Sequence, residues 1–269
     1  MLRTLCPEGD SFAELVRKNL YLTFPSDLHS ASWRNWGNLV QFVQQSNPTL
    51  RTIAALCAIA TGSEPPFKKN PRIHAIVNFN IDAVLRAYVH ARYTYPLVRT
   101  VERPSKSPDP QKISVYYMHG FLRFDRRAGR LDKEAADKLV LSEHEYFDFF
   151  NNPTGLFNYA FLYWLREHSC LFIGLSMQDD NVRRLLHYSA KERFQAYREE
   201  GETRAEAKLK ACRHFAILKQ DDSADINQAI ERSLTELGTR VLWVRSHDEI
   251  PMRLGQMYSV AGHDWDSVY

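Results

Sequence analysis

The sequence has 269 residues, of which 44% are hydrophobic and 25% charged, and its formal net charge is +3. This balance is ordinary for a globular protein with one large domain or two small ones. It argues against direct nucleic-acid binding, because the densest basic stretch holds only Arg123, Arg126, Arg127 and Arg130, which we interpret as a solvated loop.

No apolar run approaches the ~20 residues that a membrane span needs, and the start of the chain is too short and too polar for a signal peptide. We therefore expect a cytoplasmic protein without a membrane partner. The four cysteines, Cys6, Cys57, Cys170 and Cys212, are far apart and form no CxxC pair. A tetrahedral zinc site takes ligands at short paired spacing, so we expect no metal.

The predicted elements fall into two parts. Residues 11–60 carry apolar side chains at helical spacing, and residues 61–66 break the last helix. After residue 70, short apolar runs alternate with helical patterns. We expect strands over residues 73–77, 113–118, 138–141, 169–173, 214–218 and 240–244. We expect helices over residues 83–95, 146–166, 181–198, 200–211, 225–237 and 249–257. Four prolines predict a surface loop over residues 96–111.

Alternating strands and helices predict an α/β fold with a parallel sheet and helices on its faces. Ligands of such sheets bind beyond the carboxyl ends of the strands. Three predicted strands end in polar or glycine-bearing clusters, at residues 78–82, 119–120 and 174–179. We expect the loops at these ends to converge on one crevice.

These clusters resemble the motifs of the sirtuin-like family, and in particular of its bacterial NAD-consuming defence branch. The first motif reads Asn78-Phe79-Asn80-Ile81-Asp82, and the second ends a strand in His119-Gly120. The third and most specific motif is the run from Phe172 to Leu186, which is similar to Phe-Ile-Gly-x-Ser-x-x-Asp-x-Asn-x-Arg-Arg-Leu-Leu. The order of the motifs and their place at strand ends carry the resemblance.

The resemblance implies a Rossmann-like three-layer sandwich with a mostly parallel sheet and a helical N-terminal segment. We expect a single domain over residues 1–269, with a helical part over residues 1–70 and an α/β core over residues 71–258. The family also opens with a strand and a Gly-Ala-Gly-x-Ser loop that holds the dinucleotide phosphates. This sequence contains no such loop, and we read Gly62 as a helix C-cap. We therefore expect either that the chain is truncated before Met1 or that its start codon is misplaced.

By the same resemblance, the chain cleaves NAD, its substrate, to nicotinamide and ADP-ribose. His119 would be the general base, Asn80 would position a water against the ribose, and Asp82 would orient these groups or stabilise positive charge. NAD-binding residues would be Gly120, Gly174, Ser176 and Asp179, with Ser176 and Asp179 on the adenosine-side ribose hydroxyls.

Each of these side chains also has a structural interpretation. Asn80 or Asp82 could cap the helix that follows them, and Ser176 or Asp179 could cap the helix that starts near residue 181. A histidine before a glycine at a strand end is often a satisfied structural residue. The sequence therefore leaves both interpretations open at these positions.

Three functions follow from these alternatives. The first is an NAD hydrolase of an antiphage defence system, set off by a protein partner or sensor. The second is a module that binds NAD, ADP-ribose or a partner without cleavage. The third, a protein deacylase, is disfavoured because deacylases of this family carry a paired-cysteine zinc module, and here the corresponding connection has no cysteine. A homo-oligomer is compatible with all three.

Overall fold

A computed structural model describes residues 12–24, 37–61, 73–93, 96–101, 109, 111–122, 139–140 and 156–260. The chain divides into two compact units, Met1–Phe149 with Pro251–Tyr269, and Phe150–Ile250. Whether they make one domain over residues 1–269 stays a prediction. Across the described part of the chain, no helix is both long and apolar enough to span a membrane.

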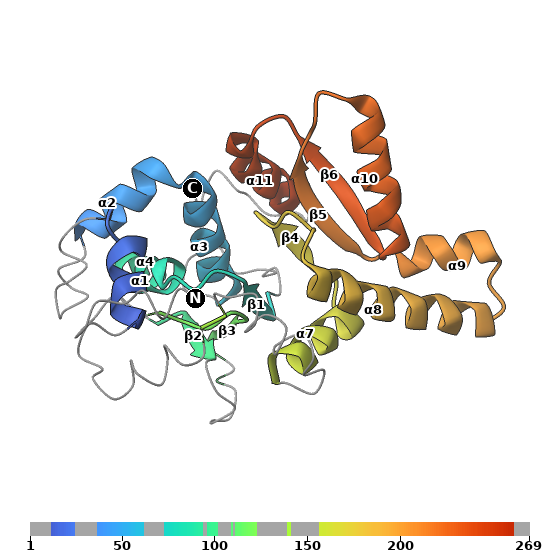
Figure 1. The fold of residues 1–269 in the computed structure, drawn as a ribbon, viewed down its shortest axis with the longest axis horizontal. Helices are drawn as coiled ribbons and strands as arrows, with labels where there is room; N and C mark the ends of the chain where they lie inside the picture. Colours follow the sequence, from blue (N-terminus) through green and yellow to red (C-terminus); the bar gives the residue numbers. More distant parts are fainter. Residues whose placement is uncertain are drawn as a thin grey trace. The chain divides into compact units, whose positions relative to one another are not determined.

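The first unit combines helices with a small parallel sheet (Figure 1). Its helices are α1 (Phe12–Leu20), α2 (Gly37–Ser46), α3 (Pro48–Ala60) and α4 (Val84–Tyr93), with α11 (Ile250–Val260) from the end of the chain. Its strands are β1 (Ala75–Asn78), β2 (Val98–Val101) and β3 (Ile113–Tyr117), in the order β1-β3-β2. In the register, Asn78 pairs with Tyr117, so β1 and β3 end side by side.

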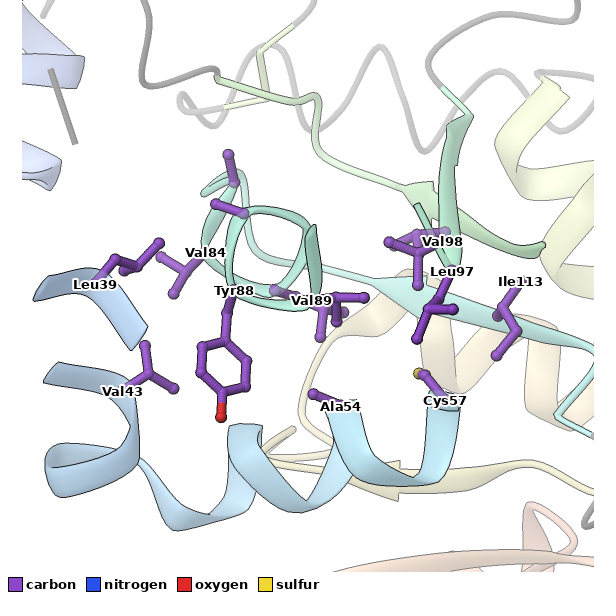
Figure 2. Close-up of a cluster of buried hydrophobic side chains, with 14 of the residues drawn as sticks. Leu39, Val43, Ala54, Cys57, Val84, Tyr88, Val89, Leu97, Val98 and Ile113 are labelled. Atoms are coloured by element: carbon purple, nitrogen blue, oxygen red, sulfur yellow. The ribbon is translucent and has the colours of Figure 1, made fainter. Parts of the chain in front are cut away.

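A core of apolar side chains joins α2, α3 and α4 to the sheet of this unit. Figure 2 shows Ala54 and Cys57 on α3 pointing toward Val89 and Leu97. The break between α2 and α3 lies at Asn47, whose side chain accepts a hydrogen bond from the Leu50 N–H and caps α3. The helical N-terminal part is thereby packed against the sheet whose strands β1 and β3 lead into the first two motifs.

The second unit is an α/β layer built on the parallel sheet β4-β5-β6, with β4 at Leu171–Ile173, β5 at His214–Lys219 and β6 at Thr239–Val244. Its helices are α7 (Leu156–Glu167), α8 (Asp180–Glu199), α9 (Arg204–Ala211) and α10 (Ala224–Glu236), followed by the 3₁₀ turn η4 (His247–Glu249). Side-chain caps from Asp179, Thr203 and Ser223 start α8, α9 and α10. Figure 1 shows α10 lying along β6.

The expected α/β class is confirmed, since every described strand pair is parallel and helices alternate with strands, as in a Rossmann-like, sirtuin-like fold. The expected loop over residues 96–111 is wrong in part, because Val98–Val101 forms β2. The β-branched residues Val98, Thr100 and Val101 lie in the run that pairs with β3, while Pro96 precedes the strand.

Some expectations fall on residues outside the described part of the chain. They include the C-cap expected at Gly62, the basic stretch Arg123 to Arg130 and the helical pattern over residues 146–155. Of the expected strand over residues 138–141, only Leu139 and Val140 are described, and neither lies in a strand. The Val140 N–H nevertheless donates to the His119 carbonyl at 3.0 Å, so this segment does run beside the second motif.

Candidate functional site

Two loops of the first unit carry the residues predicted to be catalytic. Asn80 and Asp82 lie between β1 and α4, and His119 and Gly120 follow β3. The backbone joins the loops at two points: Met118 N–H donates to Asn78 O at 2.9 Å, and Leu122 N–H donates to Ile81 O at 2.8 Å. The two loops are therefore held edge to edge beyond the carboxyl ends of neighbouring parallel strands, where ligands of α/β sheets bind.

The ring of Phe79 contacts His119 in this junction. The two ring centroids are 5.6 Å apart at an interplanar angle of 77°, an edge-to-face arrangement. His119 is half-buried, so its ring is oriented by packing while part of it remains accessible. Such partial burial suits a side chain that contacts a ligand.

Asn80 and Asp82 differ in how far the backbone uses them. The side chain of Asn80 is exposed, and its own N–H donates to Asn78 Oδ1 at 3.0 Å. Asn78 therefore shapes the turn that presents Asn80. Asp82 is half-buried, and its Oδ1 accepts from the Val84 N–H at 2.9 Å at the start of α4. Asp82 thus has a structural role, because it bonds the first N–H group of α4 from two residues before it, and one carboxylate oxygen remains outside this bond.

Burial raises the pKa of Asp82 above its usual value, while the Val84 N–H acts in the opposite direction. A carboxylate whose burial is only partly compensated is a common feature of functional sites. The charge of Asp82 therefore carries a free-energy cost in the folded chain that a purely structural cap would avoid.

The second unit holds the other predicted residues, in the loop between β4 and α8. Ser176 is exposed, and its Oγ accepts from the Gln178 N–H at 3.4 Å. Asp179 is half-buried and caps α8, because its Oδ1 accepts from the Val182 N–H at 2.9 Å. Gly174 and Met177 have φ angles of +69° and +60°, so the loop makes a tight left-handed path.

The remaining polar residues of the third motif have structural partners. Arg183 donates to the Met177 carbonyl at 3.2 Å and to Ser233 Oγ at 3.0 Å, which fixes the loop and joins α8 to α10. Buried Asn181 donates to Asn158 Oδ1 at 2.8 Å and so joins α8 to α7. These bonds explain why an Asn and an Arg stand in the first turn of α8.

The structure therefore places Asn80, Asp82, His119 and Gly120 together in the first unit. It places Gly174, Ser176 and Asp179 together in the second unit. The expectation that both groups line one crevice stays a prediction. Among the described residues, no three His, Cys, Asp or Glu side chains gather as a metal site would require.

Comparison with known families decides the ancestry of these motifs. A family model described as a SIR2-like domain matches residues 74–242, which is more than half of the chain. The chain belongs to the SIR2-like domain family. The match runs from the residue before β1 into β6 and includes both groups of site residues. Among curated proteins, none matches the chain. The sirtuin-like resemblance drawn from the motifs is thus confirmed, and membership of this family indicates an NAD-related function.

One polar contact of the first unit had no signal in the sequence. Tyr21, in the turn after α1, places its hydroxyl between the Asn80–Asp82 loop and the His119 loop. It lies outside the residues matched by the SIR2-like family model. Only the three-dimensional packing of α1 reveals it.

Proposed function

We propose that the chain is an NAD hydrolase that cleaves NAD to nicotinamide and ADP-ribose. The observation that carries the proposal is the junction of two strand-end loops, which brings the Asn80–Asp82 turn against the His119 loop in a SIR2-like domain. Family membership supports NAD as the ligand, and the chemistry of these side chains supports cleavage.

In the proposed reaction, the bond between ribose C1′ and the nicotinamide nitrogen breaks, and nicotinamide leaves with the bonding electrons. The oxygen of a water then bonds to C1′, and the water loses a proton to His119, which passes it to solvent. Asn80 positions this water through its amide, which can donate and accept. The ionised Asp82 stabilises the positive charge that develops on the ribose. NAD and water thus become ADP-ribose, nicotinamide and a proton.

In the second unit, Ser176 and Asp179 are proposed to bind the adenosine-side ribose, with Gly174 and Gly120 allowing close approach of the dinucleotide. The exposed hydroxyl of Ser176 supports this role. Asp179 would accept from ribose hydroxyls through its carboxylate, in addition to its bond to the Val182 N–H.

The motifs also resemble the antiphage-defence branch, and this resemblance supports a setting in bacterial defence. In that setting a protein partner or sensor triggers cleavage, and the chain acts as a homo-oligomer. Infected cells that express the chain would then lose NAD, whereas cells that express His119→Ala would keep it.

The test in vitro is release of nicotinamide from NAD, measured by chromatography with and without extract from infected cells. We expect His119→Ala to lower the rate at least roughly 100-fold, as loss of a general base does. The matched control is His187→Gln, which changes an exposed histidine on α8. Absence of nicotinamide release by the unaltered chain under both conditions would contradict the hydrolase.

A second candidate is a module that binds NAD or ADP-ribose without cleaving it. Asp82 and Asp179 favour it, because each already accepts from a backbone N–H and so has a structural role. Calorimetric titration with ADP-ribose separates the two candidates. Binding by both the unaltered chain and His119→Ala, with no nicotinamide release by either, would identify the module.

A further inference from the structure

Tyr21 bonds to both loops that carry the proposed catalytic residues. Its hydroxyl donates to the Leu122 carbonyl at 2.8 Å and accepts from the Ala83 N–H at 2.9 Å. Ala83 directly follows Asp82, and Leu122 lies three residues after His119. One oxygen atom therefore links the first loop to the second, in addition to the direct backbone bonds between them.

The position of this hydroxyl is fixed by apolar packing. Tyr21 is 2% exposed, and Phe24 contacts its ring edge-on with centroids 5.8 Å apart. Val16 and Leu20 of α1 pack against buried Leu122 and Leu139, together with Ile81 from the first loop. Helix α1 thus contacts both loops, and the tyrosine ring has little room to turn away from them.

The bond to Ala83 also satisfies a backbone group at a helix end. Ala83 N–H lies at the start of α4, where the first N–H groups of a helix have no partner within the helix. Burial raises the pKa of the Tyr21 hydroxyl, with a further contribution from the charge of Asp82, so the group stays protonated and can donate and accept at once.

We propose that Tyr21 is a positioning residue: its hydroxyl sets the spacing of the Asn80–Asp82 loop relative to the His119 loop. The helical segment before the region matched by the SIR2-like family model then helps to position the proposed catalytic residues. The kinetic part of this inference rests on the proposed NAD hydrolysis, whereas the structural part does not.

The substitution that isolates the hydroxyl is Tyr21→Phe, because it keeps the ring and its packing. The Ala83 N–H and the Leu122 carbonyl would each lose a buried partner. A matched control is Val43→Ala, which removes buried methyl groups from the same core on α2. It lowers stability without touching either loop.

The first measurement is amide hydrogen exchange, which needs no enzymatic activity. We expect the exchange rate of the Ala83 amide to rise at least roughly tenfold in Tyr21→Phe. In Val43→Ala, the exchange rate of this amide should rise by no more than the loss of global stability accounts for. Unchanged exchange at Ala83 in Tyr21→Phe would overturn the proposal, whether or not the chain cleaves NAD.

The second measurement is steady-state NAD cleavage. We expect Tyr21→Phe to lower kcat by roughly 10- to 100-fold with KM within about twofold, since small displacements of catalytic groups affect turnover more than binding. Val43→Ala should keep its kcat within about twofold of the unaltered chain when both are assayed at one temperature, chosen low enough that Val43→Ala is fully folded. Equal losses of kcat in both variants would overturn the positioning role. An unaltered chain without turnover contradicts the hydrolase alone, and the exchange data then decide for or against the Tyr21 link.

Discussion

The carboxylate of Asp82 accepts a hydrogen bond from the backbone N–H of Val84 at 2.9 Å, while burial raises its pKa above the usual value. The same side chain thus starts α4 and carries a charge that the fold disfavours. A carboxyl group with a raised folded-state pKa stabilises the fold while it is protonated. This contribution is lost as the pH rises from the unfolded value of about 4 through the raised one.

Substitution of Asp82 by Asn is therefore expected to separate stability from activity. The amide oxygen of Asp82→Asn can still accept from the Val84 N–H, and the cost of burying a charge disappears. We expect the melting temperature at pH 7 to rise by roughly 2 °C and NAD cleavage to fall at least roughly tenfold. Thermal unfolding and nicotinamide release measure the two effects.

The comparison variant is Asp82→Ala, which removes the cap as well as the charge. Its free energy of unfolding should be lower than that of Asp82→Asn by roughly 1 kcal/mol. If the Asn variant is no more stable at pH 7 than the unaltered chain, the charge of Asp82 does not cost what its burial implies.

Asp179 offers the same separation in the second unit, where its Oδ1 caps α8 through the Val182 N–H. Asn caps helices about as well as Asp, so the free energy of unfolding of Asp179→Asn should lie within about 0.5 kcal/mol of that of the unaltered chain. Asp179→Ala should lower the free energy of unfolding by roughly 1 kcal/mol. If the carboxylate binds ribose hydroxyls, both variants should weaken ADP-ribose binding by roughly tenfold or more. Calorimetry and urea unfolding measure these effects.

The outcome that contradicts a ligand-binding Asp179 is clear. Affinity for ADP-ribose would remain unchanged in Asp179→Asn while stability falls only in Asp179→Ala. Asp179 would then be a helix cap alone, and the resemblance at this position would reflect the start of α8.

Local patterns predicted the second unit well. Helix α8 was expected over residues 181–198 and spans Asp180–Glu199, because a long amphipathic pattern, a capping side chain and a preceding glycine turn all indicate the same start. Helix α10 was expected to end at residue 237 and ends at Glu236, where Leu237 is the C-cap and Gly238 follows with a φ of +71°. Such signals lie within a few residues of the element that they define.

Long-range contacts were not predictable in this way. The bonds of Tyr21 join residues 62 and 101 positions apart, and nothing in the sequence around α1 distinguishes this tyrosine from an ordinary apolar residue. The strand β2 was missed because the prolines in the surrounding sequence suggested a loop, whereas pairing with β3 decided its structure. For the site, the motifs indicated which residues matter but not which of them the backbone already uses.

Two glycines with similar backbone angles give a matched pair of stability predictions. Gly174 has a φ of +69° and open space where a Cβ would lie. Gly238 has a φ of +71°, but a Cβ there would lie 3.0 Å from Ala190 Cβ and 3.1 Å from the Ala211 carbonyl oxygen. Gly174→Ala should therefore cost roughly 1–2 kcal/mol from backbone strain alone.

Gly238→Ala adds overlap with two packed helices to the same strain. We expect Gly238→Ala to lower the free energy of unfolding by roughly 2–5 kcal/mol. Urea unfolding of both variants under the same conditions measures the difference. Equal losses at the two positions would show that α8 and α9 shift to accommodate the added methyl group.

His214 links the pH dependence of stability to the core of the second unit. It is fully buried; its Nδ1 accepts from the Cys170 N–H at 3.2 Å, and its Nε2 lies 3.1 Å from Nη2 of Arg193. Burial, and then the charges of Arg193 and Arg213, lower the pKa of His214 to about 3. The folded chain therefore keeps this imidazole neutral at pH values where the unfolded chain protonates it.

A histidine with a lowered folded-state pKa contributes stability that is complete above the unfolded value of about 6.5 and is lost as the pH falls toward 3. We expect the free energy of unfolding to drop by up to roughly 1.4 kcal/mol per pH unit below pH 6 on account of His214. Urea unfolding at pH 7.5, 6.5 and 5.5 measures this slope.

His214→Gln, which can still accept from the Cys170 N–H, should be less stable at pH 7.5 but should lose less stability on acidification. The control His187→Gln removes an exposed imidazole from the same unit and should leave the slope of the unaltered chain in place. A slope in His214→Gln equal to that of the unaltered chain would mean that other groups set the acid sensitivity of this unit.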